Sequence, residues 1–222
     1  MTTSIDNFLS DIKNRGLKID TIYDIGAWKG WFSRDIKNDV LPDGNFILFE
    51  ANPLHVNDLS QTGFQYFSTA LSKPGINSID FYDLGGCTGG SYYKETTSHY
   101  DNINPIKLPC TTLDQLVKDN NLPKPNFIKI DTQGSELDIL EGAKSIMDTV
   151  DLIYSECPVI CYNHGAPDIG DYLDFFKKHE MIPVEIFDIH RKENIVLQVD
   201  IMFMKNSTKE KYFGPNIHIR PL

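Results

Sequence analysis

The stretch Phe127-Ile-Lys-Ile-Asp-Thr-Gln-Gly-Ser-Glu-Leu-Asp-Ile-Leu-Glu-Gly142 decides the fold of this 222-residue chain. It has the pattern of an apolar strand that ends on Asp131, turns through glycine and begins a helix. A second stretch, Thr21-Ile-Tyr-Asp-Ile-Gly-Ala-Trp-Lys-Gly30, has the same order around Asp24. Ligands of an open parallel sheet bind in the crevice beyond the carboxyl ends of its strands. We therefore expect both aspartates to face one crevice.

The rest of the chain alternates between strand and helix patterns. A helix is expected over about residues 3–15, because apolar residues recur there at helical spacing before Gly16. Strands are expected at 19–25, 45–50, 65–71, 78–82, 126–130, 151–155, 182–187 and 198–204. Further helices are expected from Trp31 and at 55–60, 112–120, 135–147 and 168–179, with irregular segments at 83–107 and 158–165. This order predicts a mostly parallel α/β sheet in a single domain over residues 1–222.

The bulk composition is that of a globular protein, with 41% apolar and 23% charged residues. A net charge of −10 argues against nucleic-acid partners, which need a basic surface. No apolar run approaches the roughly 20 residues that span a bilayer. The first residues lack the basic and apolar regions of a signal peptide. The sequence therefore predicts a cytoplasmic protein with no membrane span.

The chain has four cysteines, Cys87, Cys110, Cys157 and Cys161. So few in a chain of this length are expected to be reduced. Cys157, Cys161 and His164 have the spacing C-x3-C-x2-H of a zinc site. However, a fourth ligand is not evident and Pro158 intervenes, so we expect free thiols and no metal.

The first glycine turn indicates a cofactor. Its pattern, D-x-G-x-x-x-G, fits the nicotinamide fingerprint G-x-G-x-x-G poorly, because the acid precedes the glycines. It suits S-adenosylmethionine better, with a carboxylate near the cationic amino-acid moiety and glycines against the backbone. Glu50, at the end of the next strand, is placed to accept both ribose hydroxyls. Ala70 and Leu71 are predicted to line an adenine pocket. A tight structural turn, a solvated loop acid and plain core residues are the alternative interpretations of these positions.

Three residues are candidates for the reaction itself. Asp131 and Glu156 end adjacent expected strands, and His164 lies in the irregular segment that follows. Methyl transfer to a hydroxyl needs in-line approach and a group that accepts the hydroxyl proton. Lys129 lies on the same strand face as Asp131 and can hold that carboxylate in place. The alternatives are a helix-capping or cofactor-contacting Asp131 and a plain loop histidine at 164. Glu136, in the first helical turn, is expected to be a surface or capping acid.

With these residues named, the chain resembles the FkbM family of S-adenosylmethionine-dependent methyltransferases. The resemblance runs from about residue 20 to residue 190. The strongest match is Ile128-Lys-Ile-Asp-Thr-Gln-Gly-Ser-Glu-Leu-Asp-Ile-Leu-Glu-Gly-Ala143. The other matching pieces are Asp24-Ile-Gly-Ala-Trp-Lys-Gly-Trp-Phe-Ser33, Phe49-Glu-Ala-Asn-Pro53, Thr112-Leu-Asp114, Glu156 and Tyr162-Asn-His-Gly-Ala-Pro167.

The resemblance implies a class I methyltransferase fold, which is Rossmann-like, with a seven-stranded, mostly parallel sheet and helices on both faces. It also implies that Asp24, Gly26, Ala27 and Gly30 hold the cofactor and that Glu50 holds its ribose. The complete set of cofactor-binding residues that we predict adds Trp28, Asn52, Ala70, Leu71 and Asp131. Two positions depart from the family pattern. Trp28 replaces a small polar residue, and Gln133 replaces a glutamate, which weakens any metal-dependent mechanism.

The predicted function is O-methylation of a hydroxyl on a sugar or glycan, with Asp131, Glu156 and His164 around the acceptor. The aromatic, hydroxyl-rich loop from Ser91 to Tyr100 motivates the sugar, because such residues can stack on pyranose rings; a flexible surface loop is the alternative. Other hypotheses are O-methylation of a non-sugar natural product, a nicotinamide-dependent oxidoreductase and a non-catalytic cofactor-binding module. Association with glycosyltransferases is also expected.

Overall fold

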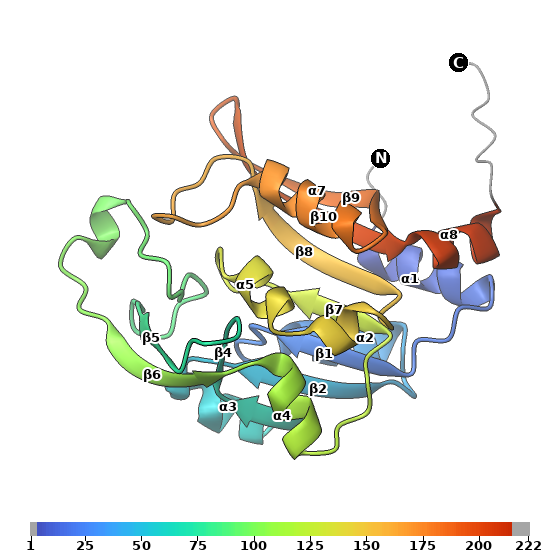
Figure 1. The fold of residues 1–222 in the computed structure, drawn as a ribbon, viewed down its shortest axis with the longest axis horizontal. Coiled ribbons are helices and arrows are strands. Elements are labelled where there is room, and N and C mark those ends of the chain that lie inside the picture. Colours follow the sequence, from blue (N-terminus) through green and yellow to red (C-terminus); the bar gives the residue numbers. More distant parts are fainter. Residues whose placement is uncertain (1–3, 215–222) are drawn as a thin grey trace.

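The computed structural model describes residues 4–214 and shows one twisted sheet with helices on both faces, beside a small second sheet (Figure 1). The helices are α1 (Ile5–Asn14), α2 (Trp31–Asp39), η1 (Pro53–His55), α3 (Val56–Ser60), η2 (Ser98–Tyr100), α4 (Leu113–Asp119), α5 (Glu136–Glu141), α6 (Lys144–Met147), α7 (Ile169–Lys178) and α8 (Asn206–Phe213). The first residue of the helix expected at 3–15 lies outside the described residues.

The central sheet has seven strands in the order β3-β2-β1-β7-β8-β10-β9. Its strands are β1 (Thr21–Ile25), β2 (Asn45–Glu50), β3 (Gln65–Ser68), β7 (Phe127–Ile130), β8 (Leu152–Pro158), β9 (Met181–Lys192) and β10 (Ile195–Lys205). The pairs β3–β2, β2–β1, β1–β7 and β7–β8 are parallel, whereas β10 runs antiparallel to both neighbours. The predicted seven-stranded, mostly parallel sheet is confirmed.

The middle strands are buried on both faces, which explains their continuous apolar runs. Every residue of β1 and β7 is buried, and apolar clusters pack against the two faces of the sheet. The register places Asp24 between Leu48 and Lys129. The carboxyl ends of β1, β2 and β7 therefore lie side by side, as the opening sequence patterns predict.

The strand predicted at 65–71 is two strands. After β3 the chain turns at Thr69, whose amide N–H donates to the Glu50 carbonyl at 2.9 Å. It then forms β4 (Ala70–Leu71), which belongs to the small sheet β4-β6-β5 with β5 (Ser78–Phe81) and β6 (Ile106–Thr111). The start of β6 lies within the segment that was predicted to be irregular, because none of its residues is buried and it has no buried apolar face.

The helix predicted at 135–147 is interrupted at Gly142. A Cβ at this position would lie 2.4 Å from the Ser72 carbonyl oxygen, so only glycine lets the two backbones approach so closely. The amide N–H groups of Gly142 and Ala143 still donate to carbonyls of α5, but the direction changes before α6. The break brings the segment after β4 against this helix pair.

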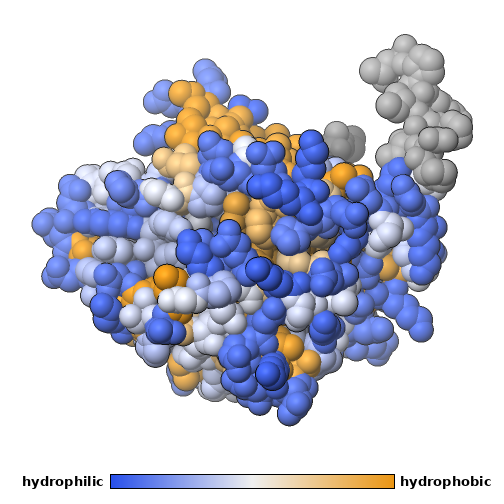
Figure 2. Space-filling view, viewed as in Figure 1, coloured by the Kyte–Doolittle hydropathy of each residue, from blue (hydrophilic) through white to orange (hydrophobic). Residues whose placement is uncertain are grey.

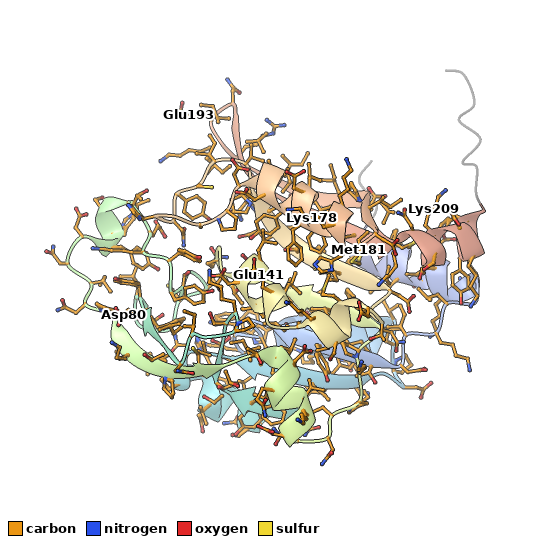
Figure 3. All side chains as sticks on the ribbon, viewed as in Figure 1. Asp80, Glu141, Lys178, Met181, Glu193 and Lys209 are labelled. Atoms are coloured by element: carbon orange, nitrogen blue, oxygen red, sulfur yellow. The ribbon has the colours of Figure 1, made fainter. Side chains whose placement is uncertain are left out.

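The last two strands form a hairpin longer than the segments predicted at 182–187 and 198–204. Its tip, marked by Glu193, extends beyond the body of the molecule (Figure 3). Apolar side chains gather on this extension (Figure 2), where Ile186, Ile189 and Ile195 are exposed. Polar and apolar residues are mixed here without a clear period, which is why the sequence pattern underestimated both strands.

Candidate functional site

A cavity of about 300 Å³ lies at the carboxyl ends of β1, β2 and β7. Residues from the turns after these strands and from the small sheet line it. Most of the predicted cofactor-binding residues line it, namely Gly26, Ala27, Trp28, Glu50, Asn52, Ala70, Leu71 and Asp131. The crevice predicted from the strand-end acids is therefore a real cavity.

Glu50 is the buried carboxylate of this cavity. Its Oε2 accepts the Trp28 amide N–H at 2.7 Å, and its Oε1 accepts the Asn52 amide N–H at 2.8 Å. Burial raises its pKa to about 7, although the two N–H bonds oppose that shift. Glu50 thus joins the turns after β1 and β2, and its remaining lone pairs are available to donors from a ligand.

The raised pKa of Glu50 makes the stability of the free protein depend on pH. Its folded-state pKa of about 7 exceeds the ordinary value of 4.5, so the folded state holds the proton more tightly. The resulting stabilisation is complete below about pH 4.5 and is lost as the pH rises through about 7. We expect the loss to reach about 3 kcal/mol. Urea denaturation of the wild type and Glu50→Gln at several pH values measures it. If the free energy of unfolding changed equally with pH in the wild type and in Glu50→Gln between pH 5 and pH 8, Glu50 would not be the group responsible.

Asp24 and Gly30, predicted to hold the cofactor, do not line the cavity. Asp24 is 0% exposed; its Oδ2 accepts the Ser33 hydroxyl at 2.7 Å, and its Oδ1 lies 3.3 Å from Lys129 Nζ. This second contact is an ion pair without hydrogen-bond alignment. Gly30 packs against Leu48 instead. In this structure the acid and last glycine of the motif support the turn from behind the cavity, and their contact with the cofactor stays a prediction.

Lys129 is the cation that neutralises the buried carboxylate of Asp24. Its Nζ donates to the Gly26 carbonyl at 2.9 Å and lies 3.8 Å from Asp131 Oδ2. Burial lowers the pKa of Lys129, but the charges of Asp24 and Asp131 outweigh burial and hold it above its ordinary value. Lys129 therefore stays charged and ties β7 to the glycine turn, so it is a poor candidate for a base.

The turn after β1 has an unusual backbone conformation. Gly26 has a φ of 73°, and a Cβ there would lie 1.8 Å from the Asp131 carbonyl oxygen. Trp28 also has a positive φ, 49°, which is uncommon for a bulky residue. Its indole N–H donates to the Gly86 carbonyl at 3.2 Å. The turn thus presents its backbone and one indole ring to the cavity, at a conformational cost that the surrounding contacts must offset.

Three residues of the cavity lining have a buried polar atom without a hydrogen-bond partner in the described part of the chain. The atoms are Nδ2 of Asn52, Nε2 of His55 and Oγ1 of Thr132. Leaving a buried polar group unpaired typically costs about 1–3 kcal/mol. Together with Glu50, these atoms suit a ligand that carries several hydroxyl and nitrogen groups, as an adenine nucleoside does. The lining therefore fits the predicted cofactor.

Beside the cavity, Gln133 joins two of the predicted catalytic residues, Asp131, which lines the cavity, and Glu156, which does not. Its Nε2 donates to Asp131 Oδ1 at 2.9 Å and to Glu156 Oε1 at 3.1 Å. Gln133 has a positive φ of 56°. The Asp131 side chain is 40% exposed and reaches the cavity, whereas Glu156 is more deeply buried. The position where the family often has glutamate therefore holds two carboxylates together through one amide.

Glu156 lies within an extended polar network. Gln198 Nε2 also donates to it, through Oε2, and the register of β8 and β10 places Asp200 directly opposite. The Tyr154 hydroxyl donates to Asp200 Oδ2 at 2.8 Å. Burial raises the pKa of Glu156 to about 9, with a further contribution from Asp131. Glu156 thus holds its proton more tightly than an ordinary glutamate does.

His164 is exposed and does not line the cavity. Its amide N–H donates to the Lys94 carbonyl at 2.8 Å, and the Thr96 amide N–H donates to the Tyr162 carbonyl at 2.7 Å. The irregular segments expected at 83–107 and 158–165 therefore pair with each other beside the crevice. In this arrangement His164 contributes backbone, and a catalytic role for its imidazole gains no support from the geometry.

The tyrosines of the loop from Ser91 to Tyr100 hold that loop in place. The hydroxyls of Tyr92 and Tyr93 both donate to Asp138 Oδ2 at 2.8 Å, and the Tyr100 hydroxyl donates to the Gly89 carbonyl at 2.9 Å. Tyr92 alone among the three lines the cavity. The expectation that this loop stacks on a sugar is therefore weakened, since its hydroxyls are already engaged.

Glu136 is buried, in contrast to the surface position that was one of its two expected environments. It does cap backbone groups: Oε1 accepts the Thr132 amide N–H at 2.6 Å, and Oε2 accepts the Gly134 amide N–H at 2.9 Å. The Tyr172 hydroxyl on α7 donates to the same oxygen. The loop that presents Asp131 and Gln133 is thus folded around one carboxyl group.

Replacing Glu136 by alanine is expected to destabilise the protein by about 2–4 kcal/mol, because three buried donors lose their acceptor. Thermal unfolding and urea denaturation measure the loss. Glu141→Ala, an exposed residue on the same helix, is the matched control and should change stability little. An effect of Glu136→Ala no larger than that of the control would show that the buried carboxyl is dispensable.

The cysteines do not form the C-x3-C-x2-H site considered above. All four are free; Cys157 is buried, whereas Cys161 is exposed and its thiol contacts the Pro167 carbonyl. Cys157 points into the apolar cluster on the α7 face of the sheet. The two thiols therefore lie in different environments, as free cysteines do.

Several residues of the site were not predicted from the sequence. Trp31, Phe32, His55, Thr132, Ser135 and Tyr154 also line the cavity. Tyr154 could have been predicted from the sequence, because it lies two residues before Glu156 and therefore shares its face of the strand. Asp200 has none, because only the register of the hairpin places it opposite Glu156.

The chain is similar to proteins of known class. A profile of the methyltransferase FkbM domain matches residues 24–182. The hexuronic acid methyltransferase AglP of Haloferax volcanii is 29% identical over 158 residues, which cover 69% of this chain and 61% of that protein. The chain thus spans less than two thirds of the length of this relative. Among residues 4–214, no helix is long and apolar enough to cross a membrane.

Solved structures share the fold. The methyltransferase FkbM from Methylobacillus flagellatus superposes with a TM-score of 0.52 at 13% identity, covering 84% of this chain and 45% of that one. Magnesium protoporphyrin IX methyltransferase from Synechocystis, with bound S-adenosylmethionine, gives a TM-score of 0.50 at 8% identity, covering 90% and 75%. At such identities the likeness concerns the fold, which is that of class I methyltransferases. Because the family profile spans most of its length, the chain belongs to the methyltransferase FkbM domain family.

Proposed function

We propose that this chain is an S-adenosylmethionine-dependent O-methyltransferase that acts on a hydroxyl of a sugar or glycan. The observation that carries the proposal is the position of Asp131, a half-exposed carboxylate that lines the same cavity as the buried Glu50. The family match supports the reaction class. The similarity to a hexuronic acid methyltransferase supports the sugar.

S-adenosylmethionine, the cofactor predicted from the sequence, is the cofactor of this family. When bound, it supplies an electrophilic methyl group on a sulfonium. Glu50 accepts the ribose hydroxyls, and Asn52 and His55 offer their unpartnered nitrogens to the nucleoside. The backbone of the Gly26 turn and the indole ring of Trp28 form the wall beside them. The predicted role of Asp24 changes to a supporting one, through Lys129.

Asp131 is the proposed proton acceptor. Asp131 would take the proton that the acceptor hydroxyl loses when its oxygen receives the methyl group that the bound cofactor would supply. Lys129, 3.8 Å from Oδ2, and Gln133, 2.9 Å from Oδ1, hold the carboxylate in position. Because Glu156 accepts the same Gln133 amide, its proposed role is to orient Gln133.

A hexuronic acid offers two kinds of acceptor oxygen, the hydroxyls and the carboxylate. A base beside the cavity is needed for a hydroxyl, whose proton must leave, and is not needed for a carboxylate. The position of Asp131 therefore favours an ether product over an ester. Methyl esters are hydrolysed by mild alkali and methyl ethers are not, so the product itself distinguishes the two.

The test is transfer of labelled methyl from S-adenosylmethionine to a panel of free and glycosidically linked hexoses and hexuronic acids, beside non-sugar phenols. Alkali-stable label on a saccharide supports the proposal. Label on phenols alone would favour a natural-product acceptor, and alkali-labile label would identify a carboxylate acceptor. Cofactor binding without transfer to any acceptor would favour a non-catalytic module. The alternative of a nicotinamide-dependent oxidoreductase disagrees with membership of a methyltransferase family.

Three expectations from the sequence stay predictions. They are association with glycosyltransferases, a cytoplasmic location, and one domain over residues 1–222. The first is of interest because a partner that delivers a glycan chain would set the acceptor. Co-purification with the proteins that assemble such chains tests it.

A further inference from the structure

Next to the proposed acceptor end, three potential metal ligands come together from three neighbouring strands. They are Glu156 on β8, Asp200 on β10 and His190 on β9, and one ligand atom from each lies within 4.8 Å of the others. With bonds of about 2.1 Å, neighbouring ligands of one ion lie about 3–3.5 Å apart, and only opposite ligands reach about 4.2 Å. The three side chains must therefore close in by about an ångström to coordinate one ion.

The strand register is what brings these ligands together. Asp200 pairs with Glu156 on one side and with Asp188 on the other, and Gln198 pairs with His190. Irregularities in the β9–β10 ladder, between Val196 and Gln198 and between Asp200 and Ile201, shift His190 relative to a regular hairpin. Bulges of this kind re-aim side chains and are frequent next to functional sites.

The carboxylates of this cluster are held in place by a surrounding layer of hydrogen bonds. The Tyr154 hydroxyl donates to Asp200 Oδ2, while Gln133 and Gln198 donate to the two oxygens of Glu156. Metal ligands are characteristically oriented in this way by outer hydrogen-bond partners. The same layer connects the cluster to Asp131 through Gln133.

One atom in the cluster has no hydrogen-bond partner in the described part of the chain. Asp200 Oδ1 is fully buried, and the Asp200 side chain is 16% exposed. The histidine lies nearby, with its Nε2 4.0 Å from Asp200 Oδ2 and 3.5 Å from Asp188 Oδ2. A buried carboxylate oxygen without a donor is costly, and a cation bound beside it would remove that cost.

From this geometry we propose that Glu156, Asp200 and His190 bind a divalent transition-metal ion. Two carboxylates and one imidazole make a mixed oxygen and nitrogen set, which suits Mn²⁺, Fe²⁺ or Zn²⁺ better than the all-oxygen sites preferred by Ca²⁺. Three protein ligands leave coordination positions open. The expectation that the chain has no metal site followed from the cysteine motif, which lacks a fourth ligand, and from Gln133. The hairpin, which supplies two of the three ligands proposed here, has no such motif.

One consequence rests on the proposed function. The proposed acceptor end carries the carboxyl groups of Asp131, Asp200 and Asp188 close together, so an anionic hexuronic acid would be repelled from it. A divalent ion would neutralise this charge and offer its open positions to sugar oxygens. The site therefore provides a means of accepting an acidic sugar at a surface that would otherwise reject it.

Mn²⁺ binding to the full chain tests the site without any methyl transfer. Electron paramagnetic resonance of Mn²⁺ titrated with the free protein is expected to show one saturable site. His190→Ala and Asp200→Asn should each weaken binding at least about tenfold. Glu185→Gln, on the same strand as His190, is the control and should leave binding within about twofold. Because His190 is exposed, its substitution is not expected to affect folding.

Two results would overturn the metal site. One is no saturable Mn²⁺ or Zn²⁺ binding by the folded wild type. The other is binding that neither substitution weakens, which would place the ion elsewhere. Neither result depends on the acceptor, so failure of the metal site and failure of the methyltransferase proposal are separable. A sugar-acceptor assay with and without chelator then tests the consequence for acidic sugars.

Discussion

Glu50→Ala is expected to weaken binding of S-adenosylhomocysteine by roughly 10²–10⁴-fold. The carboxylate of Glu50 is proposed to accept two ribose hydroxyls, and each hydrogen bond to a charged group contributes about 1.5–3 kcal/mol. The substitution also removes the acceptor of the Trp28 and Asn52 amide N–H groups, so the two turns that form the cavity lose their link. Isothermal titration calorimetry measures the change directly.

The control for this experiment is Glu141→Ala, which removes an exposed carboxylate from α5 (Figure 3). It should bind S-adenosylhomocysteine as tightly as the wild type, and neither protein should bind NADH. Near-wild-type affinity of Glu50→Ala would overturn the assignment of this carboxylate to the ribose. Circular dichroism shows whether Glu50→Ala still folds. If it does not, Glu50→Gln, which keeps the size of the side chain, separates a loss of ribose contacts from a loss of folding.

Asp131→Asn is expected to lower kcat by about 10²–10⁴-fold, the usual contribution of a positioned base. Asparagine has the same shape, and its Oδ1 can still accept the Gln133 amide, so cofactor affinity should change little. The amide nitrogen, however, cannot take a proton from the acceptor hydroxyl. Steady-state kinetics with the saccharide identified in the acceptor panel, together with calorimetry on the same protein, separate the two effects.

The comparison variant for Asp131 is His164→Ala. Because His164 is exposed and outside the cavity, we expect kcat close to that of the wild type. The reverse result, a slow His164→Ala and a fast Asp131→Asn, would restore the imidazole as the base and remove Asp131 from that role. Full turnover in both variants would mean that methyl transfer here proceeds without either group.

The sequence predicted the cofactor end of this molecule well, because its signals are local. A buried strand followed by a glycine turn places Gly26 and Glu50 at one edge of the sheet whatever the rest of the chain does. The same patterns could not show which way the Asp24 side chain faces. Whether a strand-end acid faces the ligand or the interior depends on a partner more than 100 residues away, Lys129, and on Ser33 of the next helix.

The reaction end was predicted less completely, because its geometry is not local. Asp131 and Glu156 were predicted from strand ends, but Asp200 and His190 reach them only through the register of an antiparallel hairpin. A shift of one residue in that register would turn Asp200 to the opposite face of the sheet. Single-sequence patterns do not specify such a register. For the same reason, β6 and the division between β3 and β4 were missed.

The cavity and the polar network beside it come from separate parts of the chain, and this separation has a consequence for how such enzymes diversify. Glu50 and the Gly26 turn belong to the parallel half of the sheet, whereas Gln198, Asp200 and His190 belong to the terminal hairpin. Substitutions in the hairpin can alter which acceptor is recognised while the nucleoside pocket keeps its shape. Exchanging residues 181–205 between relatives should therefore transfer substrate preference and leave cofactor use intact.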